Sequence, residues 1–185
     1  MRKLALAFSL LASPALATGL QIEIAGEANG TVVIDLFEDV APQHVAQITA
    51  LAEEGAYDGI VFHRVIDGFM AQTGDVEFGK IDGGDMRMAG RGGSSRPDLP
   101  AEFSDLPFDR GVVGMARGAS FDSANSQFFI MFQPAPFLND PNNPYTVVGA
   151  VIEGMDVVDA IKRGEGRNGE VMGRPDVMST VTVTE

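Results

Sequence analysis

The fold is decided by the stretch Phe62-His63-Arg64-Val65-Ile66-Asp67-Gly68-Phe69-Met70-Ala71-Gln72-Thr73-Gly74-Asp75. It predicts two short apolar strands joined by a tight turn. A charged arginine inside an otherwise apolar strand is costly unless the side chain is paired or serves a site. Arg64 is therefore a candidate functional residue, although an arginine extending along the rim of a β-barrel would fit the same pattern.

Two glutamines stand at strand positions where apolar residues would ordinarily pack. Gln72 follows Met70 at the spacing of two that places both on one face of a strand. Gln127 and Phe129 have the same spacing in Ser126-Gln127-Phe128-Phe129-Ile130. Either glutamine alone would be read as a surface residue, but together they favour a functional site over a rim position for Arg64.

The length of the turn decides whether Arg64 and Gln72 share a face. A two-residue loop, Asp67-Gly68, pairs Arg64 with Ala71 and leaves Gln72 on the other face. A three-residue loop, Asp67-Gly68-Phe69, pairs Arg64 with Gln72. Local turn chemistry slightly favours the shorter loop, so strand and turn rules leave both registers open.

Short apolar runs separated by Gly, Pro and Asn clusters recur along the rest of the chain. Apolar and polar residues alternate in residues 20–36, on either side of Gly26–Gly30, and predict a hairpin. Further runs lie at Ile60–Ile66, Phe69–Gly74, Gly111–Ala116, Gln127–Phe132, Thr146–Val151 and Val177–Thr184. About eight strands with few helices predict a mainly β fold, a closed eight-stranded antiparallel β-barrel, because closure removes exposed strand edges.

Two segments have the spacing of helices. Pro42 suits a first helical position, and apolar residues then recur at helical spacing until Gly55 offers a C-terminal cap. His44 lies in the first turn of this helix, where we expect it to be solvated. A second helix is predicted by the spacing of Met155, Val158 and Ile161. Glu153 and Asp156 lie near its start, Lys162 and Arg163 at its end and Gly164 beyond it, and these charges suit the helix dipole.

The composition is typical of one globular domain: 185 residues, 45% of them apolar and 21% charged, with a net charge of −13. No cluster of five or more basic residues occurs, so we expect no nucleic-acid partner, because such binding relies on Lys and Arg at phosphates. The chain has no cysteine and only two histidines, His44 and His63. Disulfides and thiolate zinc sites are excluded, and we expect no metal site and no cofactor.

The first residues predict an export signal. Arg2-Lys3 precede an apolar run, and Ala15-Leu16-Ala17 has the small-x-small pattern of a signal peptidase site. The run is shorter than the roughly 20 apolar residues that span a bilayer, so a membrane anchor is the weaker interpretation. We expect cleavage after Ala17, leaving residues 18–185 as a single mature domain with no membrane span.

A long segment from Glu77 to Pro100 is rich in glycine, shows no periodicity and predicts a surface loop with solvated arginines. Within it, Gly90-Arg91-Gly92-Gly93-Ser94 superficially suggests a phosphate-binding loop. No strand-to-helix context surrounds it, so the sequence gives that hypothesis little support.

Several strings, taken in order, resemble the cyclophilin family of peptidyl-prolyl isomerases across nearly all of the mature chain. The strings are Phe62-His63-Arg64-Val65-Ile66, Gly68-Phe69-Met70-Ala71-Gln72, Ser126-Gln127-Phe128-Phe129-Ile130, Val147-Val148-Gly149 and Glu153-Gly154-Met155-Asp156-Val157-Val158. Their order and spacing make the resemblance more specific than any single motif. It points to the bacterial exported branch of the family, with a periplasmic location.

The resemblance implies an eight-stranded barrel capped by two α-helices, with the active face outside the barrel, and it favours the three-residue loop. It implies catalytic roles for Arg64 and Gln72, with Gln72 orienting the guanidinium. The substrate-binding residues that it implies are Phe69, Met70, Ala116, Arg117, Gln127, Phe129, Phe137, Leu138 and Tyr145. The implied substrates are proline-containing segments of exported polypeptides, bound by a monomer.

Some site positions depart from the best-known eukaryotic members of the family. Phe137 stands where they have tryptophan, Tyr145 where they have histidine, and Arg117 where they have asparagine. Loss of the indole N–H donor at Phe137 predicts weak binding of cyclosporin-type ligands with catalysis retained. Beside the site, Asp67 replaces a usual proline and Thr73 a usual glycine.

Two other functions fit parts of the pattern. A binding or chaperone module would hold proline-containing segments without turning them over, and it would keep the apolar pocket while dropping the need for Arg64. A ligand-carrying barrel would need a wide lumen or polar interior residues, whereas the inward positions are Val, Ile, Leu and Phe.

Overall fold

The computed structural model describes residues 18–185, and the predicted export signal lies outside them. Within these residues the secondary structure comprises nine strands, two α-helices and one short 3-10 helix. The strands are β1 (Gly19–Ala25), β2 (Gly30–Leu36), β3 (Ile60–Val61), β4 (Arg64–Ile66), β5 (Met70–Thr73), β6 (Val112–Met115), β7 (Phe128–Met131), β8 (Val147–Glu153) and β9 (Val177–Thr184). The helices are α1 (Pro42–Glu53), η1 (Pro136–Asn139) and α2 (Met155–Ala160).

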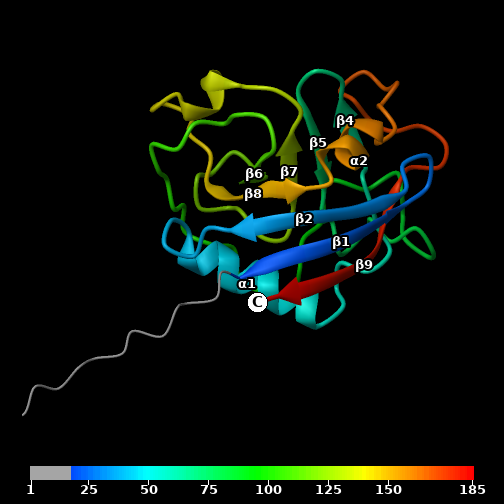
Figure 1. The fold of residues 1–185 in the computed structure, drawn as a ribbon, viewed down its shortest axis with the longest axis horizontal. Coiled ribbons are helices and arrows are strands. Elements are labelled where there is room, and N and C mark those ends of the chain that lie inside the picture. The colour runs from blue at the N-terminus through cyan, green and yellow to red at the C-terminus, as the bar shows by residue number, and fades with distance from the viewer. Residues whose placement is uncertain (1–17) are drawn as a thin grey trace, which may run out of the picture.

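All the strands join one curled antiparallel sheet, in the order β3-β9-β1-β2-β8-β6-β7-β5-β4 (Figure 1). Helix α1 packs against β9, and α2 packs against β2. Figure 1 shows α1 below the β1–β2 pair and α2 above it. The expectation of a mainly β, antiparallel fold with two α-helices is confirmed.

The prediction of a closed eight-stranded barrel is wrong, because the nine-stranded sheet of residues 18–185 forms an open half-barrel. The predicted strand Ile60–Ile66 is two strands, and β3 pairs with β9 whereas β4 pairs with β5. Between them Phe62 donates its backbone N–H to the Asp176 carbonyl at 2.9 Å. The two halves of the predicted strand thus take partners at opposite ends of the sheet order, and no ladder joins them within residues 18–185.

Loops cover both edge strands of the sheet. Lys80 forms an isolated bridge with Ile60 on the free side of β3, and Glu170 forms one with Arg64 on the free side of β4. Val65 of β4 also donates its N–H to the Gly169 carbonyl at 2.7 Å. Backbone groups that an edge strand would expose are therefore partly satisfied by loops.

Apolar side chains fill the inside of the curl. Ile22 and Ile34 of the first hairpin pack there with Phe62 and Phe128, and each of these side chains is fully or almost fully buried. A ligand-carrying barrel would need a lumen at this place. The packed core gives that alternative no support.

Helix α2 lies in the predicted segment but ends earlier than predicted. Ile161 leaves the helical conformation with a ψ of 131°, and its side chain enters the core. The next backbone N–H, that of Lys162, is donated to the Asp176 carboxylate at 2.7 Å instead of continuing the helix. A distant acceptor therefore overrides the local helical pattern.

The prediction of a solvated His44 is wrong, because its side chain is 0% exposed. Its Nδ1 lies 2.6 Å from a carboxylate oxygen of Glu102, which comes from a loop that crosses the start of α1. The same carboxylate accepts the backbone N–H groups of Gln43 and His44, both at 3.1 Å. Glu102 thus satisfies the free donors at the N-terminus of α1 that no local side chain caps.

The segment from Glu77 to Pro100 contains neither a helix nor a strand, as predicted. Its arginines differ in their surroundings: Arg96 forms an ion pair with Glu54 and is half-buried, whereas Arg87 pairs with Asp85 at the surface. Arg91 is exposed. In the described part of the chain, no helix is long and apolar enough to cross a membrane.

Candidate active site

The turn between β4 and β5 has three residues, Asp67-Gly68-Phe69. Ile66 pairs with Met70 and Arg64 with Gln72, and Gly68 takes the positive φ of +66° that the turn requires. This register places Arg64 and Gln72 on one face of the sheet, which is the geometry that the family resemblance favours. The two-residue alternative is excluded.

The guanidinium of Arg64 is fixed from two sides. Its Nε donates to the Asn168 carbonyl at 2.9 Å, and its NH1 donates to Oε1 of Gln72 at 3.1 Å. Burial lowers the pKa of Arg64, and the nearby Tyr145 and Glu170 oppose this shift. Because an arginine remains charged in proteins, the site holds a cation in a defined orientation.

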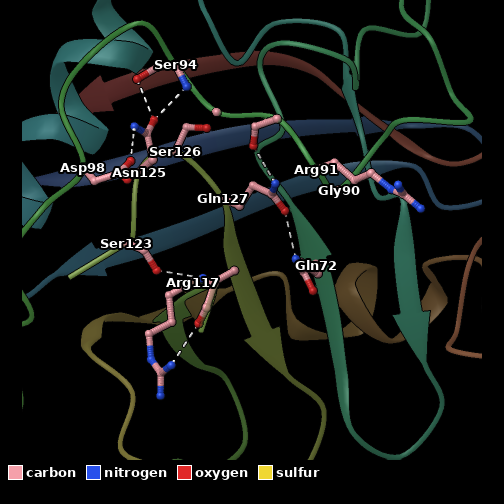
Figure 2. A pocket seen from close by; sticks show the side chains of 14 residues that line it. Gln72, Gly90, Arg91, Ser94, Asp98, Arg117, Ser123, Asn125, Ser126 and Gln127 are labelled. Atoms are coloured by element: carbon pink, nitrogen blue, oxygen red, sulfur yellow. Dashed lines mark hydrogen bonds between the residues drawn. The ribbon is translucent and has the colours of Figure 1, made fainter. Parts of the chain in front are cut away.

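A chain of hydrogen bonds continues from Gln72 away from the guanidinium (Figure 2). Nε2 of Gln72 donates to Oε1 of Gln127 at 2.9 Å, and Nε2 of Gln127 donates to the Gly92 carbonyl at 2.8 Å. A carbonyl can only accept and a guanidinium can only donate. The two ends therefore fix the orientation of both amides, with the Gln72 oxygen toward Arg64.

At the far end of these hydrogen bonds, the loop that contains Gly92 is held by Asp75, whose side chain is 0% exposed. One of its carboxylate oxygens accepts the N–H groups of Gly90 at 2.7 Å and of Gly92 at 3.0 Å. The other accepts the N–H groups of Glu77 and Phe78 at 3.1 and 2.9 Å. The carboxylate thus holds the loop whose Gly92 carbonyl anchors the glutamines.

A cavity of about 290 Å³ opens beside Arg64 on the outer face of the sheet. The rings of Phe69 and Phe137 pack against each other with centroids 5.4 Å apart and planes tilted by 42°. Tyr145 packs edge-on against Phe129 with centroids 6.0 Å apart. The residues lining it are Arg64, Phe69, Met70, Gln72, Ala116, Arg117, Phe129, Phe137, Leu138, Asn143 and Tyr145. Every candidate site residue except Gln127 lines this cavity, and Asn143 is an addition to the predicted set.

Arg117 is held in place by its protein contacts. Its guanidinium lies between two aromatic rings, 4.4 Å from the centroid of Tyr145 and 4.8 Å from that of Phe121. NH2 donates to Oδ1 of Asn143 at 2.8 Å and to the Pro144 carbonyl at 3.0 Å. Arg117 therefore contributes a fixed charge to the site wall.

A second and more polar cavity of about 420 Å³ adjoins the first. Gln72, Ala116 and Arg117 line both cavities, and Gln127 lines only the second. The remaining lining residues are Gly90, Arg91, Gly92, Gly93, Ser94, Asp98, Gly118, Ser123, Asn125 and Ser126. The glycine-rich segment that superficially suggested a phosphate-binding loop is thus one wall of this cavity (Figure 2).

His63 lies close to this network but takes no part in it. Its side chain is buried, and neither ring nitrogen has a hydrogen-bond partner among residues 18–185. Burial lowers the pKa of His63 to about 4, with a further lowering effect from Arg64 that the Asp75 carboxylate opposes. The ring is consequently neutral at physiological pH.

Sequence reasoning missed three residues that shape the site. Asp75 and Asn143 are polar residues of a kind common at the surface, and Asn168 acts through its backbone carbonyl, which any residue would supply. Only Asp75 carried a signal, because it follows Gly74 directly after an apolar strand. No group of three or more potential metal-binding side chains gathers anywhere in residues 18–185.

Together these features define a β-sheet protein with a groove on its outer face, in which a fixed cation borders a small, mainly apolar cavity. The chain belongs to the cyclophilin type peptidyl-prolyl cis-trans isomerase/CLD family, whose profile matches residues 20–183. Its activity is accordingly that of an enzyme, a peptidyl-prolyl cis-trans isomerase.

Individual relatives agree with this assignment. The chain is 59% identical over 157 residues to a probable peptidyl-prolyl cis-trans isomerase of Brucella suis, an alignment that covers 84% of this chain and 78% of the relative. It is 36% identical over 166 residues to peptidyl-prolyl cis-trans isomerase B of Escherichia coli, covering 85% and 96% of the two chains. The crystal structure of a cyclophilin type isomerase from Cryptosporidium parvum has the same fold, with a TM-score of 0.73, 23% identity and coverage of 92% and 99%.

Proposed function

We propose that this isomerase acts on X-Pro bonds of exported polypeptides, with Arg64 as the residue that stabilises the twisted peptide bond. The observation that carries the proposal is the guanidinium of Arg64, held by Gln72 at 3.1 Å beside the apolar cavity. A cation fixed in this way binds a rotating bond without moving during the reaction.

The site has to accelerate the reaction by electrostatic stabilisation of the twisted peptide bond. Rotation about a peptide bond has a barrier of about 18–20 kcal/mol because it breaks amide resonance. As resonance is lost, the prolyl nitrogen becomes pyramidal and gains a lone pair. A donor placed over that nitrogen binds the twisted state better than either planar state, and this difference in binding accelerates rotation. Arg64 is that donor, and Gln72 is the residue that positions it.

The apolar cavity supplies the other requirement, which is to hold one side of the bond while the other turns. Phe69, Met70, Phe129 and Leu138 line it and would enclose the proline ring. Their low polarity also favours the twisted amide, whose dipole is reduced by the loss of resonance. A barrier lowered by about 7 kcal/mol would give a rate increase of roughly 10⁵.

The export assignment rests on residues 1–17 and on the absence of cysteine. Without cysteine the protein has no thiol that an oxidising compartment could oxidise. We propose cleavage after Ala17, a periplasmic location and a monomeric mature protein. Expression of the full chain in a bacterial host, followed by fractionation and N-terminal sequencing, tests this. A periplasmic protein that begins at Thr18 is expected, and retention of Met1 in the cytoplasm would refute it.

A protease-coupled assay on a proline peptide tests the role of Arg64. Arg64→Ala should lower kcat/KM by about 10²-fold or more, the cost of removing a donor aimed at a transition state. Arg87→Ala is the matched control, because Arg87 is exposed and lies outside both cavities. Equal rates for wild type and Arg64→Ala, with the fold intact by circular dichroism, would remove the mechanism and favour a module that only binds proline segments.

A further inference from the structure

Two asparagines of the chain are followed by glycine, and one of them contacts the arginine of the candidate active site. The two pairs are Asn29-Gly30 and Asn168-Gly169. The peptide carbonyl of Asn168 accepts the hydrogen bond from Nε of Arg64 at 2.9 Å. An asparagine before glycine is prone to deamidation, because glycine has no Cβ to hinder the attack of its backbone nitrogen on the asparagine side chain. A covalent change at Asn168 would therefore take place directly beside Arg64.

The side chain of Asn168 is the least restrained of the asparagine side chains. It is exposed and forms no hydrogen bond within residues 18–185. Every other asparagine forms a side-chain hydrogen bond, and these are Asn29, Asn125, Asn139, Asn142 and Asn143. The amide carbon of Asn168 can therefore turn towards the next backbone nitrogen without breaking a side-chain contact.

The attacking nitrogen belongs to Gly169, the last residue of a tight surface turn. Its N–H closes the turn by donating to the Gly166 carbonyl at 3.0 Å, and its φ of +81° is one that glycine adopts freely. Arg167 and Asn168, at the tip of the turn, are exposed. Attack requires the turn-closing bond to open, which is a local fluctuation of a surface turn and leaves the sheet folded.

The pair Asn29-Gly30 provides a comparison within the same chain. Nδ2 of Asn29 donates to the Gly26 carbonyl at 2.8 Å. Gly30 is the first residue of β2 and pairs with Ile24 of β1. Reaction at Asn29 requires a side-chain hydrogen bond to break and the end of a strand pair to open. The same dipeptide is thus more restrained at Asn29 than at Asn168.

We infer that Asn168 is a site of spontaneous deamidation, and that the isoaspartyl product inactivates the enzyme through Arg64. The backbone nitrogen of Gly169 attacks Cγ of Asn168, a new C–N bond forms, and the side-chain amide leaves as ammonia with the proton of the Gly169 N–H. Water then opens the cyclic imide at one of its two carbonyls. Opening at the side-chain carbonyl gives aspartate. Opening at the main-chain carbonyl gives isoaspartate, in which the chain continues through the former side chain.

The two products affect the guanidinium of Arg64 differently. In the aspartyl product the peptide carbonyl that accepts the Nε–H bond is retained, and the new charge lies on an exposed side chain. In the isoaspartyl product this carbonyl becomes part of a free carboxylate, which binds a guanidinium through charge-assisted hydrogen bonds. The carboxylate reduces the positive charge that Arg64 offers to the prolyl nitrogen. This last step rests on the proposed catalytic role of Arg64.

The first experiment measures the modification alone. The purified protein is incubated at mildly alkaline pH, where more of the backbone amide is deprotonated, and is then analysed by peptide mass spectrometry and an isoaspartate assay. Aspartate and isoaspartate should form at Asn168 about fivefold faster than at Asn29, as expected from one hydrogen bond fewer to break. Reaction at Asn29 with Asn168 intact, or reaction at neither, would overturn the inference.

The second experiment follows kcat/KM in the same samples, each compared with its own fresh enzyme. Wild type and Asn29→Gln should lose activity in proportion to the isoaspartate at residue 168. Asn168→Gln should not decline, because its longer side chain forms the cyclic imide far more slowly. After chromatographic separation, kcat/KM of the isoaspartyl form should be about tenfold or more below that of the aspartyl form. Equal values for the two forms, with Arg64→Ala impaired, would overturn the inference.

Nitrogen–proton NMR distinguishes failure of this inference from failure of the proposed function. The Nε–H signal of Arg64, assigned by its loss in Arg64→Ala, should shift in the isoaspartyl form and stay in place in the aspartyl form. An unshifted signal in the isoaspartyl form would contradict the link to Arg64 whatever the activity. A shifted signal, with normal turnover by both the isoaspartyl form and Arg64→Ala, would instead refute the catalytic role of Arg64.

Discussion

Oε1 of Gln72 accepts a hydrogen bond from NH1 of Arg64 at 3.1 Å, directly across the β4–β5 pair. The bond exists because the intervening turn has three residues, and it would be lost if either strand slipped by one position. The orientation of a charged side chain is thus set by backbone pairing and by an amide whose own orientation is fixed at Gly92.

Replacing the amide of Gln72 by an apolar group should show whether Gln72 positions the guanidinium of Arg64 or binds the substrate. Gln72→Leu removes one of the two acceptors that hold Arg64, the other being the Asn168 carbonyl. We therefore expect kcat to fall about tenfold to a hundredfold through misplacement of the guanidinium. The affinity for a proline peptide, followed by NMR titration, should change little. Gln21→Leu, on the outer face of β1 and away from the groove, is the control; a loss confined to KM in Gln72→Leu would contradict the positioning role.

Asp75 should be required both for stability and for rate. Asp75→Asn removes the charge from a buried acceptor of four backbone N–H groups. The free energy of unfolding should fall by about 1.5–3 kcal/mol, the contribution of a hydrogen bond to a charged group. Urea denaturation measures the stability, and the isomerase assay measures kcat at a temperature where the variant is folded. Wild-type kcat in a destabilised Asp75→Asn would show that the loop does not position the glutamines.

His63 should make the protein less stable in acid. Its pKa falls from an ordinary 6.5 to about 4 in the folded chain because the ring is buried. Between these values the unfolded chain binds a proton that the folded chain does not, so the contribution to stability is present above pH 6.5. It is lost as the pH falls towards 4, and amounts to about 3 kcal/mol.

Proton NMR can follow this titration directly, since the chain has only two histidines. A His44→Gln variant assigns the two signals, and a His63→Gln variant should show a smaller loss of stability between pH 6.5 and 4 than wild type. A His63 signal that titrates near pH 6.5 in the folded protein would contradict the prediction.

Phe137 should limit the binding of cyclosporin-type ligands. It lines the apolar cavity, is 61% exposed and offers no hydrogen-bond donor. Phe137→Trp adds an indole N–H at this lip, and we expect about five- to tenfold tighter binding, the gain from one hydrogen bond. The natural sequence has no tryptophan, so the fluorescence of the introduced indole reports binding; Phe137→Tyr is a control with a differently placed donor. An unchanged Kd would show that the indole donor is not the limiting factor.

Much of the fold could be predicted from local patterns. Alternation predicted the first hairpin, and helical spacing after Pro42 predicted α1. The failures were decided by distant residues: Asp176 takes the N–H groups of Phe62 and Lys162, which splits one predicted strand and shortens α2. Glu102 buries His44 from a position 58 residues away in the sequence. Such partners lie outside any local window of sequence, so the periodicity within a window cannot reveal them.

The apolar half of the groove could be predicted from the sequence, whereas the polar half could not. The strand residues around Arg64 carried a recognisable pattern, and the family resemblance selected the turn that strand rules left open. The second, more polar cavity takes one wall from the glycines of a loop without periodicity, and its other lining residues come from segments far away in the sequence. That loop lies beside Gln127 because Asp75 holds it through four hydrogen bonds, which reach up to 17 residues along the chain.

The loops that lie on β3 and β4 have a consequence for association with other chains. Extended chains add readily to any sheet with a free border. Here Lys80 and Glu170 occupy the two borders at Ile60 and Arg64. Another chain can therefore add a strand at either border only by displacing these loop contacts, which disfavours edge-to-edge association.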